Sequence, residues 1–264
     1  MPFTYSPAQK KRDGEGSLGR RKKRSETKHL VAFVELLFFI LTFGSITMAK
    51  ETANIGGIVI DVQGDFTRFK NGSLPIEGTD EAYIKTLEEN TKKLKEAGFP
   101  IFATQDWHSS NHASFFTYHK GKKAFDVIKL HGKDQILWPP HCVQNTPGAE
   151  ILLDKKLFNA IIKMGTDPQY DSYSGFQDDR GKKTNMEKIL KKNKIRKLVV
   201  YGIGIDDCVK TTALDGVALG YKVILIKNLS RGVARDTSLI AIEEMKAKGI
   251  VVLDDVDLEK IKAN

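Results

Sequence analysis

Short apolar runs alternate with segments of helical periodicity between residues 56 and 253. Such runs are typical of strands that are buried on both faces, and the helical segments between them are long enough to connect parallel strands. The alternation predicts an α/β fold with three layers, in which helices flank a mostly parallel, Rossmann-like sheet. Strands are expected at residues 56–62, 100–105, 161–163, 197–201, 221–227 and 250–253, and helices at 79–97, 184–193, 206–219 and 236–248.

Polar side chains stand where several of these predicted strands end. Asp61, Asp106 and Lys163 each close a strand, and a glycine-bearing turn follows the strand at 197–201. Ligands of open parallel sheets bind outside the carboxyl ends of the strands. Residues 109–149 form a long irregular insertion, and a loop of that length in a compact domain is usually functional. The pattern therefore predicts one site at this edge of the sheet.

The first 49 residues differ from the rest of the chain in composition. Residues 1–29 carry nine lysines and arginines against three acidic residues, within a chain of 264 residues whose net charge is +9. Because most of the excess charge lies in this tail, the domain itself gives no sign of a nucleic-acid partner. Residues 30–43 are almost wholly apolar, broken only by Glu35, and residues 44–49 end in small residues; the segment 30–49 therefore predicts a signal peptide or a membrane anchor.

Two interpretations of this N-terminal segment lead to different locations. As a signal or an anchor, it would place the domain at 50–264 outside the cytoplasm, exported to the periplasm or medium or attached to a membrane. If translation instead starts at Met48, the preceding residues are not made and the protein is cytoplasmic. The domain at 50–264 is expected in either case.

Cys208 begins a predicted helix, after a strand and a turn with two glycines. The positive end of a helix dipole favours the thiolate, and free N–H groups in such a turn can bind an oxyanion. A buried, inert cysteine is the alternative for a lone thiol. Asp61 is expected to accept the thiol proton, and Lys163 to lower the pKa of both groups from within the same crevice. These three residues are the predicted catalytic group.

Asp106 and His108 form the core of a predicted metal site. Side chains at i and i+2 on an extended segment point to the same side, and His141 on the long insertion is the expected third ligand. Two imidazoles and one carboxylate leave positions open for water or substrate, which is typical of catalytic metal sites. One divalent ion is predicted, zinc with iron or manganese as alternatives. His112 is a weaker candidate, as a ligand or as an orienting group.

Six short motifs occur in the order in which they occur in nicotinamidases of the isochorismatase-like cysteine hydrolase superfamily. The likeness extends from about Gly56 to Asp255, so that the chain resembles this family over nearly the whole predicted domain. The matching stretches are 60–66, 105–112, 138–144, 163–165, 171–176 and 202–210.

The resemblance implies a metal-dependent cysteine amidohydrolase that converts nicotinamide to nicotinate and ammonia through a thioester, in NAD salvage. Pyrazinamide is the expected second substrate. The backbone N–H groups of Gly204 and Cys208 would form the oxyanion hole, beside a cis peptide between Ile203 and Gly204. The other implied positions are the triad Asp61, Lys163 and Cys208, the metal ligands Asp106, His108 and His141, and the pocket residues Phe66, Trp138 and Tyr173.

The turn before the cysteine departs from the family pattern, in which Ala-Thr-Asp often precedes the residue before Cys. Here the corresponding residues are Gly204, Ile205 and Asp206, followed by Asp207. The change to Gly204 removes only a methyl group, so the oxyanion hole is expected to persist. Ile205 and Asp207 are expected to alter the fine substrate preference.

Three rival functions make different demands on these residues. An isochorismatase-like amidase for another small amide or carbamoyl substrate would share the triad but lack the ring-binding metal. A true isochorismatase lacks the nucleophilic cysteine. A membrane-tethered metal-binding protein would leave Asp61, Lys163 and Cys208 without a role. A hydrolase of a small molecule accounts for most of the residues, and the sequence leaves open whether it forms a homo-oligomer.

Overall fold

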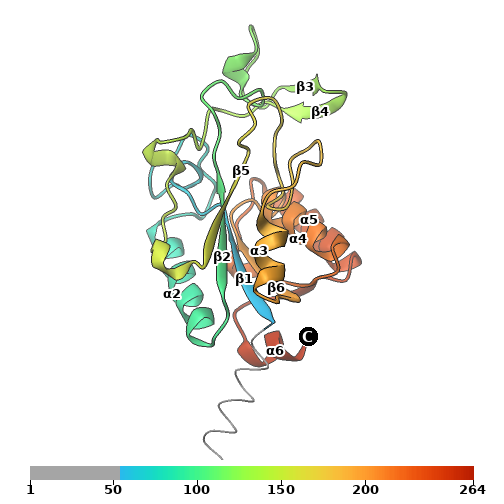
Figure 1. The fold of residues 1–264 in the computed structure, drawn as a ribbon. Helices are drawn as coiled ribbons and strands as arrows, with labels where there is room; N and C mark the ends of the chain where they lie inside the picture. Colours follow the sequence, from blue (N-terminus) through green and yellow to red (C-terminus); the bar gives the residue numbers. More distant parts are fainter. Residues whose placement is uncertain (1–53) are drawn as a thin grey trace, which may run out of the picture. The chain divides into compact units, whose positions relative to one another are not determined.

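The computed structural model describes residues 54–264, so the predictions for residues 1–29 and 30–49 lie outside the described part. In that part, no helix combines the length and the apolar character that a membrane crossing requires. The fold is a three-layer α/β arrangement, as the strand pattern predicts (Figure 1).

Six strands form the central sheet in the order β5-β2-β1-β6-β7-β8. All of its strand pairs are parallel. The chain moves outward from β1 to β2 and β5 on one side, and from β6 to β7 and β8 on the other. The connections therefore diverge between β1 and β6, which is where such sheets bind ligands. The strands are β1 (Ile55–Ile60), β2 (Ile101–Asp106), β5 (Ala160–Met164), β6 (Lys197–Gly202), β7 (Lys222–Ile226) and β8 (Val251–Leu253).

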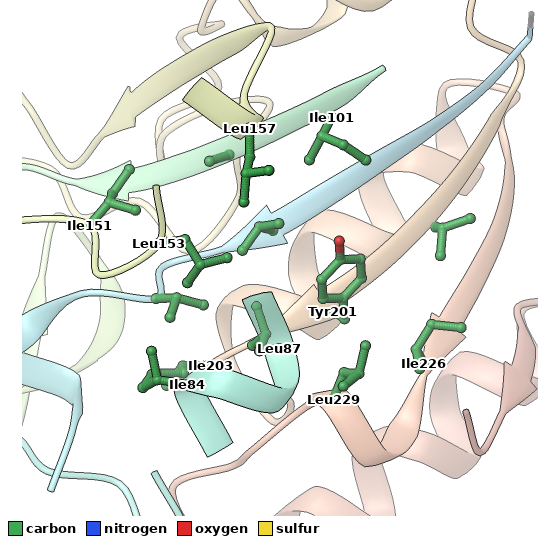
Figure 2. Close-up of a cluster of buried hydrophobic side chains, with 14 of the residues drawn as sticks. Ile84, Leu87, Ile101, Ile151, Leu153, Leu157, Tyr201, Ile203, Ile226 and Leu229 are labelled. Carbon is green, nitrogen blue, oxygen red and sulfur yellow. The ribbon is translucent and has the colours of Figure 1, made fainter. Parts of the chain in front are cut away.

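Helices cover both faces of the sheet because successive strand residues point to opposite sides. Val59 of β1 packs in one apolar cluster with Leu87 of α2, and Figure 2 shows part of this cluster. Ile58 and Ile60 pack in the other cluster with Val209 of α4. The first face carries α2 (Glu81–Glu96) and α6 (Leu258–Ala263), and the second carries α3 (Met186–Lys192), α4 (Cys208–Ala218) and α5 (Arg235–Ala247).

Local signals in the sequence set the ends of α2. The carboxylate of Asp80 accepts a hydrogen bond from the N–H of Tyr83 at 2.9 Å, which caps the first turn. Gly98 follows the helix with φ of 90°, a left-handed conformation that glycine adopts without steric cost.

Three elements were not predicted from the sequence: α6 and the antiparallel strands β3 (Val127–Leu130) and β4 (Lys133–Ile136) in the long insertion. The hairpin turn is made by His131 and Gly132, both with positive φ. Val127 and Ile136 remain exposed, and neither strand alternates between apolar and polar residues, so the hairpin lacks the pattern by which a half-buried strand is recognised. Single turns of 3₁₀ helix are η1 (Gly64–Phe66), η2 (Phe116–Tyr118), η3 (Pro147–Ala149), η4 (Lys155–Leu157) and η5 (Lys227–Leu229).

Candidate active site

A cavity opens at the carboxyl ends of β1, β2 and β6, where the connections diverge. It encloses about 490 Å³ of space between atoms, its open mouth included. Asp61 directly follows β1, Asp106 ends β2, Gly204 lies in the turn after β6, and Cys208 begins α4 after that turn; all four line the cavity. Residues that are far apart in the sequence thus meet at the edge of the sheet where the strand pattern places a site.

Asp61 is fixed at this cavity by Thr104 of β2. Its Oδ1 accepts a hydrogen bond from the Thr104 hydroxyl at 2.6 Å, and its own N–H donates to the same hydroxyl at 3.1 Å. The Oδ2 atom is buried and has no hydrogen-bond partner within residues 54–264. Burial and the neighbouring Asp106 carboxylate raise the pKa of Asp61 to about 7. A carboxyl group with such a pKa can take up and return a proton near neutral pH.

The thiol of Cys208 lies at the same cavity, at the first residue of α4. Burial, followed by the charges of Asp61, Asp106 and Asp207, raises its pKa well above the ordinary value. The predicted net lowering of the Cys208 pKa is therefore wrong in direction, because burial and the neighbouring carboxylates both disfavour the thiolate. A thiol in this setting stays protonated until a base accepts its proton, and Asp61 is the adjacent base.

The strand register decides which side chain of β5 faces the site. In the pairing of β2 with β5, Gln105 lies beside Lys163 and Asp106 lies beside Met164. Paired residues of parallel strands point to the same face, so Met164 shares the face of Asp106 and Lys163 shares that of Gln105. Met164 is buried, whereas Lys163 is exposed.

The predicted placement of Lys163 in the crevice is therefore wrong. Its ammonium group lies 3.6 Å from the centre of the Trp107 ring, on the face of the sheet opposite to the helix that carries Cys208. A shift of one residue along a strand reverses the face, and the neutral side chain of Met164 occupies the position that the prediction gave to a cation.

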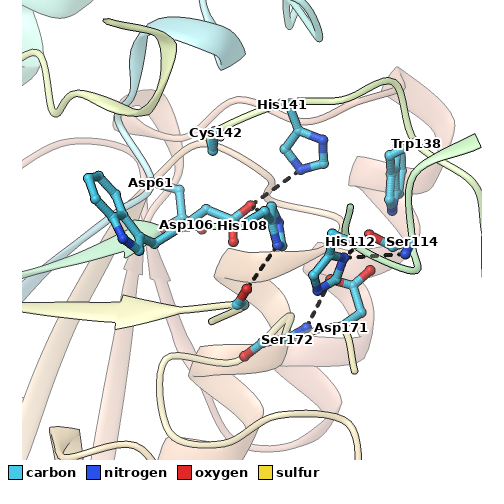
Figure 3. A network of polar contacts seen from close by, with 12 residues as sticks. Asp61, Asp106, His108, His112, Ser114, Trp138, His141, Cys142, Asp171 and Ser172 are labelled. Atoms are coloured by element: carbon cyan, nitrogen blue, oxygen red, sulfur yellow. Dashed lines mark hydrogen bonds and ion pairs between the residues drawn. The ribbon is translucent and has the colours of Figure 1, made fainter. Parts of the chain in front are cut away.

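Asp106, His108 and His141 converge beside the cavity, as Figure 3 shows. Oδ2 of Asp106 lies 2.8 Å from Nε2 of His108 and 3.3 Å from Nε2 of His141. The other ring nitrogen of each histidine donates to a backbone carbonyl, that of Gly165 at 3.1 Å and that of Pro139 at 2.8 Å. A proton held on Nδ1 in this way leaves Nε2 as the ligand atom, so both rings present Nε2 toward the same point.

This donor set fits a divalent metal ion. All three side chains are buried, and Oδ1 of Asp106 has no hydrogen-bond partner among the described residues. Burial lowers the pKa of His108, but the adjacent Asp106 carboxylate outweighs burial and raises it to about 9. A binding cation would displace that proton, as is usual for imidazole ligands. Two imidazoles and one carboxylate suit zinc, and also iron or manganese.

The ring of His112 packs against that of His108, with the two ring centres 4.3 Å apart. Its Nδ1 is 2.7 Å from the hydroxyl of Ser114, and its Nε2 is 3.3 Å from the carbonyl oxygen of Tyr170. A second group of potential ligand atoms consists of His108, His112 and Asp171. Because both ring nitrogens of His112 already have partners, the arrangement favours its orienting role over direct ligation.

The three predicted pocket residues line the cavity. The phenol oxygen of Tyr173 accepts a hydrogen bond from Nε1 of Trp138 at 2.8 Å, which fixes both rings. The ring of Phe66 lies 5.3 Å from that of His141. An apolar wall with fixed aromatic rings thus adjoins the two imidazoles and the carboxylate, an arrangement suited to a flat ring that carries a polar atom.

The predicted oxyanion hole is present only in half. The N–H of Gly204 donates to the carbonyl oxygen of Arg231 at 2.8 Å, whereas the N–H of Cys208 has no hydrogen-bond partner within residues 54–264. The peptide bond between Ile203 and Gly204 is trans, since residues 54–264 contain no cis peptide, so the expected cis bond is wrong. One free donor therefore points from the start of α4.

Residues 57–256 match the family model described as the isochorismatase domain. The chain belongs to the isochorismatase family. Nicotinamidase of Escherichia coli strain K12 is 36% identical over 208 residues, covering 77% of this chain and 96% of that protein. The solved yeast nicotinamidase has a TM-score of 0.72 at 30% identity, covering 76% of this chain and 100% of that one. Pyrazinamidase of Pyrococcus horikoshii in complex with zinc has a TM-score of 0.63 at 36% identity, covering 76% and 98%.

Two residues at the site of this isochorismatase-family chain were not predicted from the sequence to have a role there. Thr104 holds Asp61, and Asp171 lines the cavity with its oxygens engaged by the N–H of Ser172 at 2.9 Å and by Nε2 of Gln135 at 2.9 Å. Thr104 precedes Asp106 by two residues on one strand, so the alternation of faces could have revealed it. Asp171 begins the matching stretch 171–176, and its place in that motif was the available signal.

Replacing Lys163 with alanine is expected to leave kcat/KM of the family's hydrolytic reaction within about threefold of wild type, the usual range for surface substitutions. The reason is the location of the ammonium group over Trp107, away from the thiol. Steady-state kinetics on the purified variant would check this. A loss of tenfold or more would show that the Lys163 side chain reaches the reacting groups during turnover.

Proposed function

We propose that this chain is a cysteine amidohydrolase that converts nicotinamide to nicotinate and ammonia, with pyrazinamide as a second substrate. The observation that carries the proposal is the meeting of Cys208, Asp61 and the buried Asp106–His141 pair in one cavity. The substrate is supported by five curated relatives named nicotinamidase or nicotinamidase/pyrazinamidase, at 30% to 37% identity. A solved relative from L. infantum, 33% identical, was crystallised in complex with nicotinate.

In the first half of the reaction, Asp61 accepts the proton of the Cys208 thiol. The sulfur then attacks the amide carbon of nicotinamide, and the electrons of the carbonyl double bond move to its oxygen. When the carbonyl re-forms, the carbon–nitrogen bond breaks and Asp61 returns the proton to the departing nitrogen, which leaves as ammonia. The product at this stage is a thioester between the pyridine acyl group and Cys208.

In the second half, Asp61 accepts a proton from a water molecule that attacks the thioester carbon. The carbon–sulfur bond breaks, nicotinate leaves, and the proton returns to the sulfur of Cys208. The free N–H of Cys208 is the donor available to the negative oxygen in both halves, and one such donor typically contributes about 10²–10³ in rate.

The remaining residues hold the substrate in place. Phe66, Trp138 and Tyr173 enclose the ring. Asp106, His108 and His141 would hold a divalent ion, which would supply a positive charge for the pyridine nitrogen and so orient the ring. Zinc is the proposed ion, supported by the pyrazinamidase relative solved in complex with zinc, with iron and manganese as alternatives.

A nicotinamide assay with and without a chelator tests this proposal. The purified chain is expected to release ammonia and nicotinate in equal amounts. Dialysis against a strong chelator is expected to lower kcat/KM by at least about 10²-fold through lost substrate orientation, and added zinc to restore it. A small carbamoyl amide serves as the comparison substrate. Turnover of that compound but not of nicotinamide would favour the related amidase and contradict the proposal.

A further inference from the structure

We propose that the turn after β1 positions the metal ligands, with Gln63 holding Asp106 and Asp65 holding the segment of His141. The inference rests on the metal group of the proposed function. Gln63 and Asp65 lie in or next to the single 3₁₀ turn Gly64–Phe66, which follows Asp61 within five residues. The same short segment would therefore supply the base and fix two ligands that come from other parts of the chain.

The side-chain amide of Gln63 forms hydrogen bonds with both the N–H and the carbonyl oxygen of Asp106. The side-chain Nε2 donates to the carbonyl oxygen of Asp106 at 2.8 Å, and the N–H of Asp106 donates to Oε1 of Gln63 at 2.8 Å. The second proton of Nε2 goes to the carbonyl oxygen of Ala149 at 2.9 Å. Gln63 is fully buried, so its amide has no water to exchange with. The pair of bonds fixes the backbone of Asp106, and with it the direction of the carboxylate.

Asp65 acts on the other ligand segment. Its Oδ2 accepts a hydrogen bond from the N–H of Cys142, the residue after His141, at 2.8 Å. Cys142 has φ of 46°, a left-handed conformation that non-glycine residues seldom adopt without a stabilising contact. A Cβ at Gly148 would lie 2.1 Å from the same Oδ2, so this carboxylate fits only against a glycine. Asp65 thereby holds the backbone on which His141 is placed.

A purely structural role is the alternative, and Gln105 offers a matched comparison. It precedes Asp106, it is buried, and its Nε2 donates to the same Ala149 carbonyl at 2.8 Å. The side chains of Gln105 and Asp106 point to opposite faces of β2, and within residues 54–264 Gln105 makes no hydrogen bond to Asp106. Replacing Gln105 removes a buried amide from the same neighbourhood without touching the ligand.

The test compares Gln63→Met with Gln105→Met in the full chain, since methionine is close to glutamine in length and cannot make these hydrogen bonds. Zinc affinity is measured by competition with a chromogenic chelator, and ligand geometry by the visible absorption of the cobalt-loaded protein. Gln63→Met is expected to weaken zinc binding by about tenfold or more and to change the cobalt spectrum, as loss of a group that orients a ligand usually does. Gln105→Met is expected to keep both within about threefold of wild type, as a change away from the ligands.

Equal weakening by the two substitutions, or wild-type affinity in Gln63→Met, would overturn the inference. If Gln63→Met fails to fold, Asp65→Ala takes its place, with Asp65→Asn as the variant that keeps an oxygen for the Cys142 N–H. Asp65→Ala is expected to weaken zinc binding, and Asp65→Asn to retain most of the wild-type affinity; equal effects would contradict the role of Asp65.

The zinc affinity and the cobalt spectrum can be measured without turnover. A chain that binds zinc but hydrolyses no nicotinamide therefore refutes only the proposed function, whereas a wild-type chain that binds no zinc refutes this inference.

Discussion

Replacing Cys208 with alanine is expected to lower kcat for nicotinamide by about 10⁴-fold or more, the scale seen when an enzyme loses its nucleophile. No other thiol lines the cavity among the described residues, because the remaining cysteine there, Cys142, is buried away from it. Ammonia release at saturating nicotinamide is the measurement. Zinc content should match wild type because Cys208 is outside both groups of potential ligands, and the loss of one partly buried sulfur should lower the stability only slightly.

Cys142→Ala provides the matched control for this experiment. Cys142 is the other of the chain's two cysteines, it is fully buried, and its sulfur has no part in the proposed chemistry. The substitution is expected to reduce stability through a small cavity, by about 1 kcal/mol, while kcat stays within about tenfold of wild type. Residual activity of Cys208→Ala within tenfold of wild type would remove the thioester from the mechanism.

Asp61→Asn is expected to lower kcat by about 10²–10⁴-fold, the range that general acid–base groups contribute. The amide keeps the shape of the carboxyl group but cannot accept the thiol proton. The raised pKa of Asp61 also predicts the pH dependence of the wild-type enzyme. Burial and Asp106 raise the pKa of Asp61 to about 7, so wild-type kcat should fall as the pH drops through that value and the carboxylate becomes protonated.

The Asp61→Asn variant should lose that acidic limb, and its zinc content should remain at the wild-type level because Asp61 is outside the ligand set. A pH profile of kcat from 5 to 9 with both proteins distinguishes these outcomes. An unchanged acidic limb in the variant would mean that another group accepts the proton, and loss of zinc would mean that Asp61 acts on the ligands instead.

The parallel sheet could be predicted from the sequence because its strands are continuous apolar runs between clear helical segments. β1, β2 and β6 lie where the pattern places them, and the carboxyl ends of these strands supply Asp61, Asp106 and the turn to Cys208. The β3–β4 hairpin could not be predicted in the same way. Its exposed apolar side chains do not report a buried face, so the two-residue turn is its only local signal.

The error at Lys163 has a different physical origin. Lys163 closes the predicted strand, and its side chain was expected to point into the cavity. The register of β5 with β2 decides which face of the sheet each side chain occupies, and it places Lys163 on the other face. Lys163 and Met164 are neighbours in the sequence and lie on opposite sides of the sheet. Similarly, the partner of the Gly204 N–H is the carbonyl of Arg231, a contact between distant segments that no local pattern announces.

The pairing of β1 with β6 joins the most distant sequence positions of the sheet, with Ile55 beside Lys197 and Ile60 beside Gly202. Asp61 and Cys208 extend from these two strands, whereas Asp106 extends from β2 on the other side of β1. A fluctuation that parted β1 from β6 would therefore separate the base from the sulfur while the base stayed next to the ligand strand. This pairing is the longest ladder of the sheet, with six residue pairs against five between β2 and β5, so the most extensive backbone contact of the sheet keeps the base beside the sulfur.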